Sequence, residues 1–85
     1  MIISFTQIAF EDYQNWSKND KLIFKKINTL IKEILRTPFT GTGKPEPLKH
    51  ELSGYWSRRI NDEHRLVYKV EEDEVLVISC MYHYK

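Results

Sequence analysis

The chain opens with a short apolar segment, after which apolar and polar residues alternate at helical spacing. Residues 1–5, MIISF, have the length and composition of a strand. In the stretch that follows, Ala9, Tyr13 and Trp16 recur at steps of four and three residues, which places them on one face of a helix. The pattern then breaks, and Asp20 is well suited to be the N-cap of a second helix. We therefore predict a strand and then a first helix that ends before Asp20.

The second helical stretch has the strongest periodic signal in the sequence. Its apolar positions recur at steps of four, three and four residues: Ile23, Ile27, Leu30 and Ile34. This helix should end near Thr37, because Pro38 disfavours helical backbone in the residue before it. Together the two stretches predict a helical hairpin whose apolar faces pack on a sheet.

Residues 38–54 contain all three prolines and all three glycines of the chain. We expect no regular element there, because so many helix- and strand-breaking residues interrupt both patterns. A loop of this length in a small domain is uncommon and is often functional. Prolines stiffen the backbone around Lys44 and Glu46 in GKPEP, so we expect both charges to be held in place, and the same loop offers Lys49.

From Tyr55 onward apolar residues recur at every second position, which is the period of a strand. We predict three strands, YWSRRI, HRLVYKV and VLVISCMYHY, joined by NDE and by an acidic turn around EEDE. The even positions should face the helices. The odd positions should form a polar face that carries Ser57, Arg59, Arg65, Lys69, Ser79 and His83. Arg65 and His83 share this face only if the acidic turn has an odd length, which we therefore expect.

The turn at Asn61–Glu63 has a further consequence for the arginines. Three residues in this turn pair Ile60 with His64, and Arg59 then lies directly opposite Arg65. Two opposed arginines repel each other. A sheet that keeps them there suggests a binding site for an anion.

Together these elements predict an α/β (α+β) fold, with an N-terminal strand and a helical hairpin packed on a small twisted, mostly antiparallel sheet. At 85 residues, we expect residues 1–85 to form a single domain. Hydrophobic residues make up 41% of the chain, which is enough for one core and argues against disorder. No apolar run approaches the roughly 18–20 residues that span a bilayer, and the N-terminus lacks the basic region of a signal peptide. We therefore expect a cytoplasmic protein without membrane contact.

The cysteine and histidine residues do not suggest a metal or redox centre. Cys80 is the single cysteine, so no internal disulfide can form, and its even position favours the core over a role as nucleophile. No two histidines have the spacing of metal ligands, so we predict no metal and no cofactor. We interpret His50 and His64 as structural or solvent-facing, and Trp16 and Trp56 as core or dimer contacts.

The net charge of +1 is low for a protein that holds free nucleic acid through its own field. Basic residues nevertheless gather in the second half of the chain, among them Lys49, Arg58, Arg59 and Arg65. A contact with nucleic acid should therefore be local, or a larger partner should present the strand.

Glu46, the two arginines and His83 suit the metal-free cleavage of RNA. The 2′-hydroxyl must lose a proton to attack the phosphate, the 5′-oxygen must gain one to leave, and the phosphorane between them needs cations. Glu46 fits the first task, His83 the second, and Arg59 with Arg65 the third, because a planar guanidinium matches two phosphate oxygens. Many protein surfaces show these residue types together, so they do not decide the function alone.

The run TPFTGTGKPEPLKHELSGYWSRRINDEHRLVYKV, with the terminal MYHYK, resembles the YoeB family of the RelE/ParE toxin superfamily. The likeness covers essentially the whole chain. It implies Glu46 as the general base, His83 as the general acid and Arg65 as the residue that binds the phosphate. The other residues that it implies for binding RNA are Lys49 and Arg59 as supporting cations and Tyr84 as the aromatic group near the cleaved nucleotide.

The same resemblance implies the function and the partners. The chain should be the toxin of a type II toxin–antitoxin system, an mRNA interferase that enters the ribosomal A site and leaves a 2′,3′-cyclic phosphate and a 5′-hydroxyl. A ribosome that presents the messenger would account for the weak net charge. The implied protein partners are a YefM-like antitoxin and a second copy of the chain. The chain departs from the family pattern at Lys85, which follows the usual terminal His-Tyr, and at Met81, where arginine is common.

Two other functions stay open. A ParE-like relative would poison DNA gyrase without cutting RNA, although such a toxin has no need of the acid–base pair Glu46 and His83. A binding module or transcriptional co-repressor would use the same basic face without any reaction.

Overall fold

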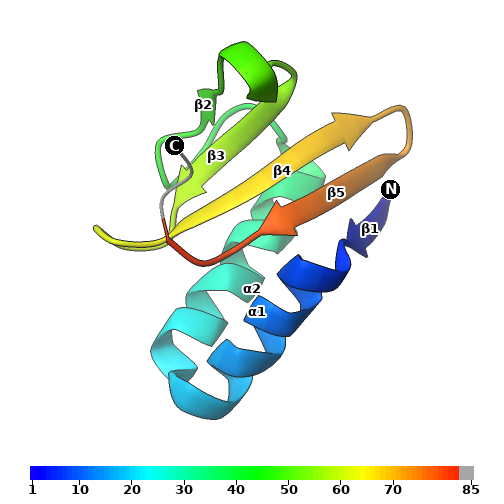
Figure 1. The fold of residues 1–85 in the computed structure, drawn as a ribbon. Helices are drawn as coiled ribbons and strands as arrows, with labels where there is room; N and C mark the ends of the chain where they lie inside the picture. Colours follow the sequence, from blue (N-terminus) through cyan, green and yellow to red (C-terminus); the bar gives the residue numbers. More distant parts are fainter. Residues whose placement is uncertain (83–85) are drawn as a thin grey trace.

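The computed structural model describes residues 1–82 and shows two helices packed against one face of a five-stranded sheet (Figure 1). In chain order the elements are β1 (Ile2–Phe5), α1 (Gln7–Asn19), α2 (Lys21–Arg36), β2 (Glu46–Pro47), the 3-10 helix η1 (His50–Leu52), β3 (Tyr55–Arg59), β4 (Arg65–Glu71) and β5 (Glu74–Ser79). The strand order is β1-β5-β4-β3-β2, with β1 parallel to β5 and all other neighbours antiparallel. This confirms the predicted fold class. Within the described residues no helix is long and apolar enough to cross a membrane.

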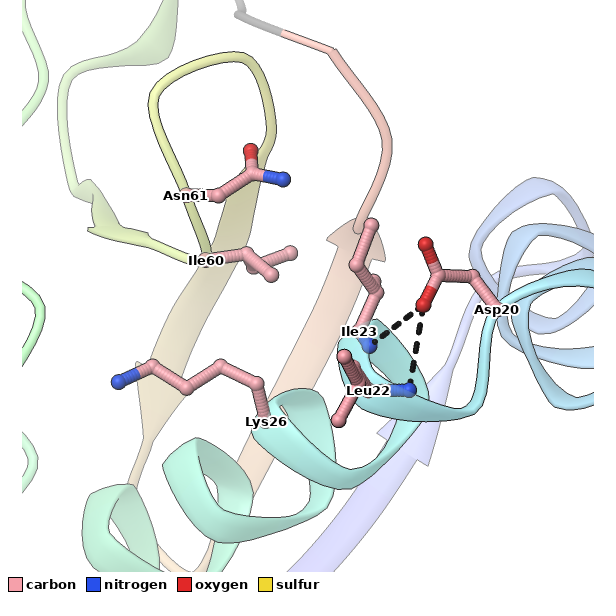
Figure 2. Close-up of a pocket in the computed structure, with 6 residues that line it drawn as sticks. All are labelled: Asp20, Leu22, Ile23, Lys26, Ile60 and Asn61. Carbon is pink, nitrogen blue, oxygen red and sulfur yellow. Dashed lines mark hydrogen bonds between the residues drawn. The ribbon is translucent and has the colours of Figure 1, made fainter.

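Asp20 separates the two helices and caps both of them. Its backbone N–H donates to the Trp16 carbonyl oxygen at 3.0 Å and closes α1. Its carboxylate accepts from the N–H groups of Leu22 and Ile23, each at 3.1 Å, and begins α2 (Figure 2). A cap of this kind stabilises a helix by about 1 kcal/mol. The predicted cap is confirmed, and α2 ends one residue before Thr37, as predicted.

The core lies between α2 and the central strands. Its fully buried apolar side chains include Ile27, Leu30 and Ile34 from α2 and Leu66, Tyr68, Val75 and Val77 from the sheet. Each large apolar side chain buried in this way stabilises the fold by about 1.5–3 kcal/mol. The predicted helix stripe is confirmed, with Ile23 half-buried at the edge of the core.

Cys80 lies in this core, as predicted. Its side chain is fully buried, and its Sγ lies 3.7 Å from the carbonyl oxygen of Ala9. Burial, with a smaller contribution from the charge of Asp12, raises the pKa of the Cys80 thiol to about 12. The thiol therefore stays protonated at neutral pH, as expected of a core residue.

The last strand does not follow the predicted alternation of faces. Val75 and Val77, at odd positions, are fully buried, whereas the even positions of β5 are only half-buried. The turn is the reason. Glu71 pairs with Glu74, so two residues connect β4 to β5 and the prediction of an odd-length turn is wrong. A turn of even length pairs the even positions of β4 with the odd positions of β5.

A β-bulge restores the expected register toward the end of β5. Tyr68 pairs with Val77, but the neighbouring Val67 pairs with Ser79, so β5 carries one extra residue at this point. Beyond the bulge, odd positions of β4 oppose odd positions of β5. The strand ends at Ser79, short of the predicted end.

Residues 38–54 contain two short elements that the density of proline and glycine did not predict. One is η1, and the other is β2, an edge strand of two residues in which Glu46 pairs with Ser57 of β3. Pro47 fits in β2 because an edge strand tolerates a residue that has no N–H to donate. The predicted loop is therefore partly incorporated into the sheet.

Arg58, one of the basic residues in the second half of the chain, ties this segment down and is not exposed to a partner. Its side chain is fully buried and lies on the helix-facing side of β3. Its guanidinium donates five hydrogen bonds, to the Tyr68 hydroxyl (3.2 Å), to Glu33 Oε1 (2.8 Å) and to the carbonyl oxygens of Thr37 (2.7 Å), Thr40 (2.8 Å) and Thr42 (3.2 Å). A guanidinium has five N–H donors, so there is an acceptor for each of them.

Glu33 of α2 completes this network. Its carboxylate accepts hydrogen bonds from Arg58 and from both the backbone N–H and the hydroxyl of Thr42. The two bonds from Thr42, followed by the bond and the charge of Arg58, lower the pKa of Glu33 below its ordinary value. The carboxylate is therefore held in its charged form between α2 and the loop.

The lowered pKa of Glu33 predicts a specific acid dependence of stability. The unfolded chain takes up a proton at this carboxyl group near its ordinary pKa of 4.5, whereas the folded chain does so only at lower pH. The contribution of Glu33 is therefore fully present above that ordinary pKa and is lost as the pH falls through the folded value. We expect Glu33→Gln to lose unfolding free energy less steeply than the unmodified chain below about pH 5. Urea unfolding at several pH values measures the two slopes, and equal slopes would contradict the prediction.

Gly41 supports the same network, because a side chain there would occupy the place of the Glu33 carboxylate. A Cβ on Gly41 would lie 1.9 Å from Glu33 Oε1. Gly54 is a matched control: its φ is also positive, +96° against +123° for Gly41, but no atom lies within 4 Å of an added Cβ. Backbone strain should cost each alanine variant about 1–3 kcal/mol. Gly41→Ala should cost more than Gly54→Ala in chemical denaturation, and equal losses would show that the carboxylate does not need this space.

Candidate active site

One face of the sheet is turned away from α1 and α2, and it carries three of the six residues predicted for chemistry: Glu46, Arg59 and Arg65. We call the side chains of Glu46, Ser57, Arg59, Arg65 and Val67 the outer face. Glu46 pairs with Ser57 of β3, which in turn pairs with Val67 of β4. Arg59 pairs with Arg65. Because side chains alternate across each strand, this register turns all five to the same side of the sheet.

Glu46 is exposed, and hydrogen bonds on both sides of it hold its backbone against β3. Before it, the N–H of Arg59 donates to the carbonyl oxygen of Gly43 at 2.6 Å. After it, the N–H of Leu48 donates to the carbonyl oxygen of Tyr55 at 2.8 Å. In the register Glu46 lies diagonal to Arg59, at about 7–8 Å between Cα atoms, which long side chains can bridge.

Arg59 and Arg65 lie directly opposite each other, as predicted. Arg59 is exposed, whereas Arg65 is half-buried and its Nη1 donates to the carbonyl oxygens of Asn61 (2.7 Å) and His64 (3.1 Å). Neither arginine forms an ion pair with another residue in the range 1–82. An anion bound between them would relieve their mutual repulsion.

The remaining predicted residues are not placed by the sheet. Lys49 is exposed at the start of η1, beyond the end of β2. His83 and Tyr84 lie outside the described residues. The position of the residue before them is defined, because the carbonyl oxygen of Tyr82 accepts a hydrogen bond from the Arg65 N–H at 3.2 Å. The described chain therefore ends beside the backbone of Arg65.

Three residues outside the predicted site hold the segment before His83: Asp12, Trp16 and His64. The structural interpretation of His64 is confirmed, since its side chain is buried. Nothing in the sequence singles out Asp12. The three side chains bind backbone groups that lie 68, 64 and 18 residues away along the chain, for Asp12, Trp16 and His64 respectively. Periodicity and local motifs carry no signal for contacts of this kind.

A hollow of about 440 Å³ lies away from the outer face, between the first turn of α2 and the turn that follows β3 (Figure 2). It is lined by Asp20, Leu22, Ile23, Lys26, Ile60 and Asn61. Of the described residues predicted for chemistry, which are Glu46, Lys49, Arg59 and Arg65, none lines it. The candidate site is therefore distinct from this hollow. It lies on a sheet face where Glu46 and Arg59 are exposed and Arg65 is half-buried, while Ser57 and Val67 between them are buried.

Comparison with known proteins identifies one family. Residues 5–84 match the family model of the YoeB-like toxin of bacterial type II toxin-antitoxin system. Toxin YoeB of Escherichia coli (strain K12) is 57% identical over 84 residues, which cover 99% of this chain and 100% of the relative. The solved structure of the YoeB/ParE toxin from Agrobacterium tumefaciens is similar with a TM-score of 0.96 and 48% identity, over 99% of this chain and 100% of that one.

Two solved structures from Staphylococcus aureus are also similar to this chain. The YoeB dimer gives a TM-score of 0.93 and 53% identity, over 99% of this chain and 98% of that one. The heterotetrameric complex of the YoeB-YefM toxin-antitoxin gives a TM-score of 0.91 at 53% identity, with the same coverage of 99% and 98%.

Proposed function

The chain belongs to the YoeB-like toxins of bacterial type II toxin–antitoxin systems, and on that basis we propose that it is a ribosome-dependent endoribonuclease that cuts messenger RNA. The observation that carries this proposal is the register of the outer face, which sets Glu46 diagonal to Arg59, and Arg59 opposite Arg65 on the next strand. A carboxylate able to accept a proton, next to two cations able to bind a phosphate, supports cleavage of a phosphate ester.

In the proposed reaction the RNA supplies its own nucleophile. Glu46 accepts the proton of the 2′-hydroxyl as that oxygen forms a bond to the adjacent phosphorus. The bond from phosphorus to the 5′-oxygen then breaks, and His83 donates a proton to the departing oxygen. The products are a 2′,3′-cyclic phosphate and a 5′-hydroxyl. The proton gained by Glu46 balances the proton lost by His83, so no metal or cofactor is needed.

Arg65 and Arg59 stabilise the negative charge that builds up on the phosphorane. Hydrogen bonds from Nη1 of Arg65 to the carbonyl oxygens of Asn61 and His64 already restrict its guanidinium. A cation oriented before the substrate arrives stabilises the transition state without further reorganisation. Lys49 supplies further positive charge for the RNA backbone. Tyr84 stacks on a base next to the cut, as aromatic side chains commonly do with single-stranded RNA.

The ribosome is the proposed source of the messenger strand. A net charge of +1 gives this chain little long-range attraction for free RNA. Glu46 and Arg59 are exposed, so a larger partner has to align the strand and exclude water from the reacting groups. The A site of a translating ribosome in the cytoplasm would do both.

We also propose a YefM-like antitoxin and a second copy of the chain as partners. The relative from S. aureus is known both as a dimer and in a complex with YefM, and it is 53% identical to this chain. An antitoxin that restrains the reaction should cover or distort the outer face, where an acidic segment would neutralise Arg59 and Arg65.

The roles of Glu46 and His83 can be separated by the leaving group. On ordinary ribosome-bound messenger, Glu46→Ala and His83→Ala should each lower the single-turnover rate by about 10²–10⁴-fold. When sulfur replaces the bridging 5′-oxygen at the cut site, the leaving group no longer needs a proton. His83→Ala should then recover most of its rate, whereas Glu46→Ala should stay slow, because the 2′-hydroxyl still has to be activated.

Glu51→Ala is the matched control for this experiment, because Glu51 is another exposed glutamate of the same segment. It should cut both substrates at the rate of the unmodified chain. If sulfur rescues Glu46→Ala and leaves His83→Ala slow, the two roles are reversed. If the unmodified chain leaves the messenger intact in a cell-free translation system, the proposed activity is wrong and a gyrase poison or a binding module becomes the better hypothesis.

A further inference from the structure

The segment that leads from β5 toward the end of the chain is bound to α1 through its backbone. The carboxylate of Asp12 accepts a hydrogen bond from the N–H of Cys80 at 3.3 Å. The indole N–H of Trp16 donates to the carbonyl oxygen of Cys80 at 2.8 Å. Both peptide groups that flank the Cα of Cys80 are therefore held by side chains of one helix.

Two residues farther along, the hairpin formed by β3 and β4 binds the backbone in the same way. The N–H of Tyr82 donates to Nδ1 of His64 at 2.8 Å, and the carbonyl oxygen of Tyr82 accepts from the N–H of Arg65 at 3.2 Å. We call the side chains of Asp12, Trp16 and His64 the tail clamp. Together with the backbone of Arg65, the clamp makes four hydrogen bonds to a segment of three residues.

His64 is itself held firmly enough to act as part of a clamp. Only 6% of its surface is exposed, and its ring lies between those of Trp16, at 4.7 Å between centroids, and Tyr82, at 5.1 Å. Since Nδ1 accepts a hydrogen bond, the proton of the neutral ring lies on Nε2, which is 3.6 Å from Glu63 Oε1. The backbone N–H of His64 donates to the side chain of Asn61 at 2.7 Å.

The clamp holds Tyr82 in a strained conformation. Its φ is +63°, in the left-handed region that residues other than glycine rarely adopt. Such a conformation is unfavourable and persists only where its surroundings impose it. Backbone strain of this kind clusters at functional sites, and the next residue in the sequence after Tyr82 is His83.

We propose that His64 is a positioning residue, supported by Trp16 and Asp12, which fixes the peptide of Tyr82, the residue that precedes the proposed general acid His83 in the sequence. This inference rests on the proposed function, in which His83 is the general acid. His64 does not touch the RNA. It acts through one hydrogen bond to the backbone of the residue that precedes the acid.

Two variants of His64 separate this hydrogen bond from the packing of the ring. His64→Phe keeps a ring against Trp16 and Tyr82 but removes the acceptor. His64→Asn gives up part of the ring but places its Oδ1 close to the position of Nδ1, so that it can still accept from the Tyr82 N–H. Ile34→Val in α2 is the control for stability alone, because Ile34 belongs to the core and makes no hydrogen bond to the segment 80–82.

We expect His64→Phe to slow the chemical step, as misplacement of the general acid would. Its single-turnover rate should fall about 10²-fold, the size of effect that a displacement of about 1 Å produces, and KM should change little. His64→Asn should recover most of the rate, and Ile34→Val should not lose it. In the His83→Ala background His64→Phe should cause no further loss, because the group that it positions is already gone. Sulfur at the 5′-position should rescue His64→Phe as it rescues His83→Ala.

Hydrogen exchange at the Tyr82 amide provides a readout that does not depend on cleavage. The amide should be protected in the unmodified chain and in His64→Asn, and it should exchange much faster in His64→Phe. Ile34→Val should leave its protection unchanged at a pH and temperature where the fold is stable.

A semisynthetic chain gives the same test without any change of side chain. Since Cys80 is the single cysteine, residues 80–85 can be joined to residues 1–79 by ligation at this position. An ester in place of the Tyr82 amide replaces the N–H that donates to His64 by an oxygen, which cannot donate. This chain should lose activity as His64→Phe does, whereas the all-amide chain made by the same ligation should be fully active.

The outcomes distinguish this inference from the proposed function. A Tyr82 amide that exchanges freely in the unmodified chain would overturn the clamp. Lost protection with unchanged cleavage, or losses that add to those of His83→Ala, would overturn the positioning role and leave the proposed nuclease intact. If the unmodified chain does not cut, or if His83→Ala cuts normally, the proposed function fails and the positioning role fails with it.

Discussion

The buried guanidinium of Arg58 is the interaction on which the rest of the candidate site depends. Its five hydrogen bonds join Glu33 of α2 to three carbonyl oxygens of the following loop and to the hydroxyl of Tyr68. A buried guanidinium is tolerated only when its N–H donors have acceptors, and buried carbonyl oxygens of the loop likewise need donors. Arg58 and the loop therefore stabilise each other. The loop is ordered despite its prolines and glycines, and it delivers Glu46 to the edge of the sheet as β2.

The two faces of the sheet have separate tasks. The helix-facing side carries the apolar core and Arg58, and these determine stability. The outer face opposes Arg59 to Arg65, which costs stability through repulsion and is the kind of local conflict that functional sites retain. Three segments distant in the sequence meet at this face or its border: the loop that bears Glu46, the hairpin with its arginines, and the chain end held through Tyr82. Among the described residues, the fold brings a carboxylate, Glu46, and the two arginines onto one face of the sheet.

Features encoded by local signals were predictable from the sequence, and features that depend on distant contacts were not. The helical stripe, the Asp20 cap and the pairing of Arg59 with Arg65 follow from spacing within a few residues. The buried odd positions of β5 were missed, because a two-residue turn and a bulge decide its register. Arg58 occupies a core position that only its loop acceptors explain. The face that Glu46 occupies was unpredictable, since β2 exists only through its pairing with β3. The contacts of the tail clamp could not be predicted either, because they join residues that are far apart in the sequence.

The central claim is that the 2′-hydroxyl of the RNA, activated on the outer face of this sheet, is the nucleophile. The most direct test uses ribosome-bound messenger with a single 2′-deoxynucleotide on the 5′ side of the mapped cut, beside an otherwise identical all-ribose messenger. The account predicts that the all-ribose strand is cut to give a 2′,3′-cyclic phosphate, whereas the bond after the 2′-deoxynucleotide stays intact, because the attacking group is missing. Cleavage at the 2′-deoxy position would show that water or another external group attacks the phosphate, and it would contradict the account.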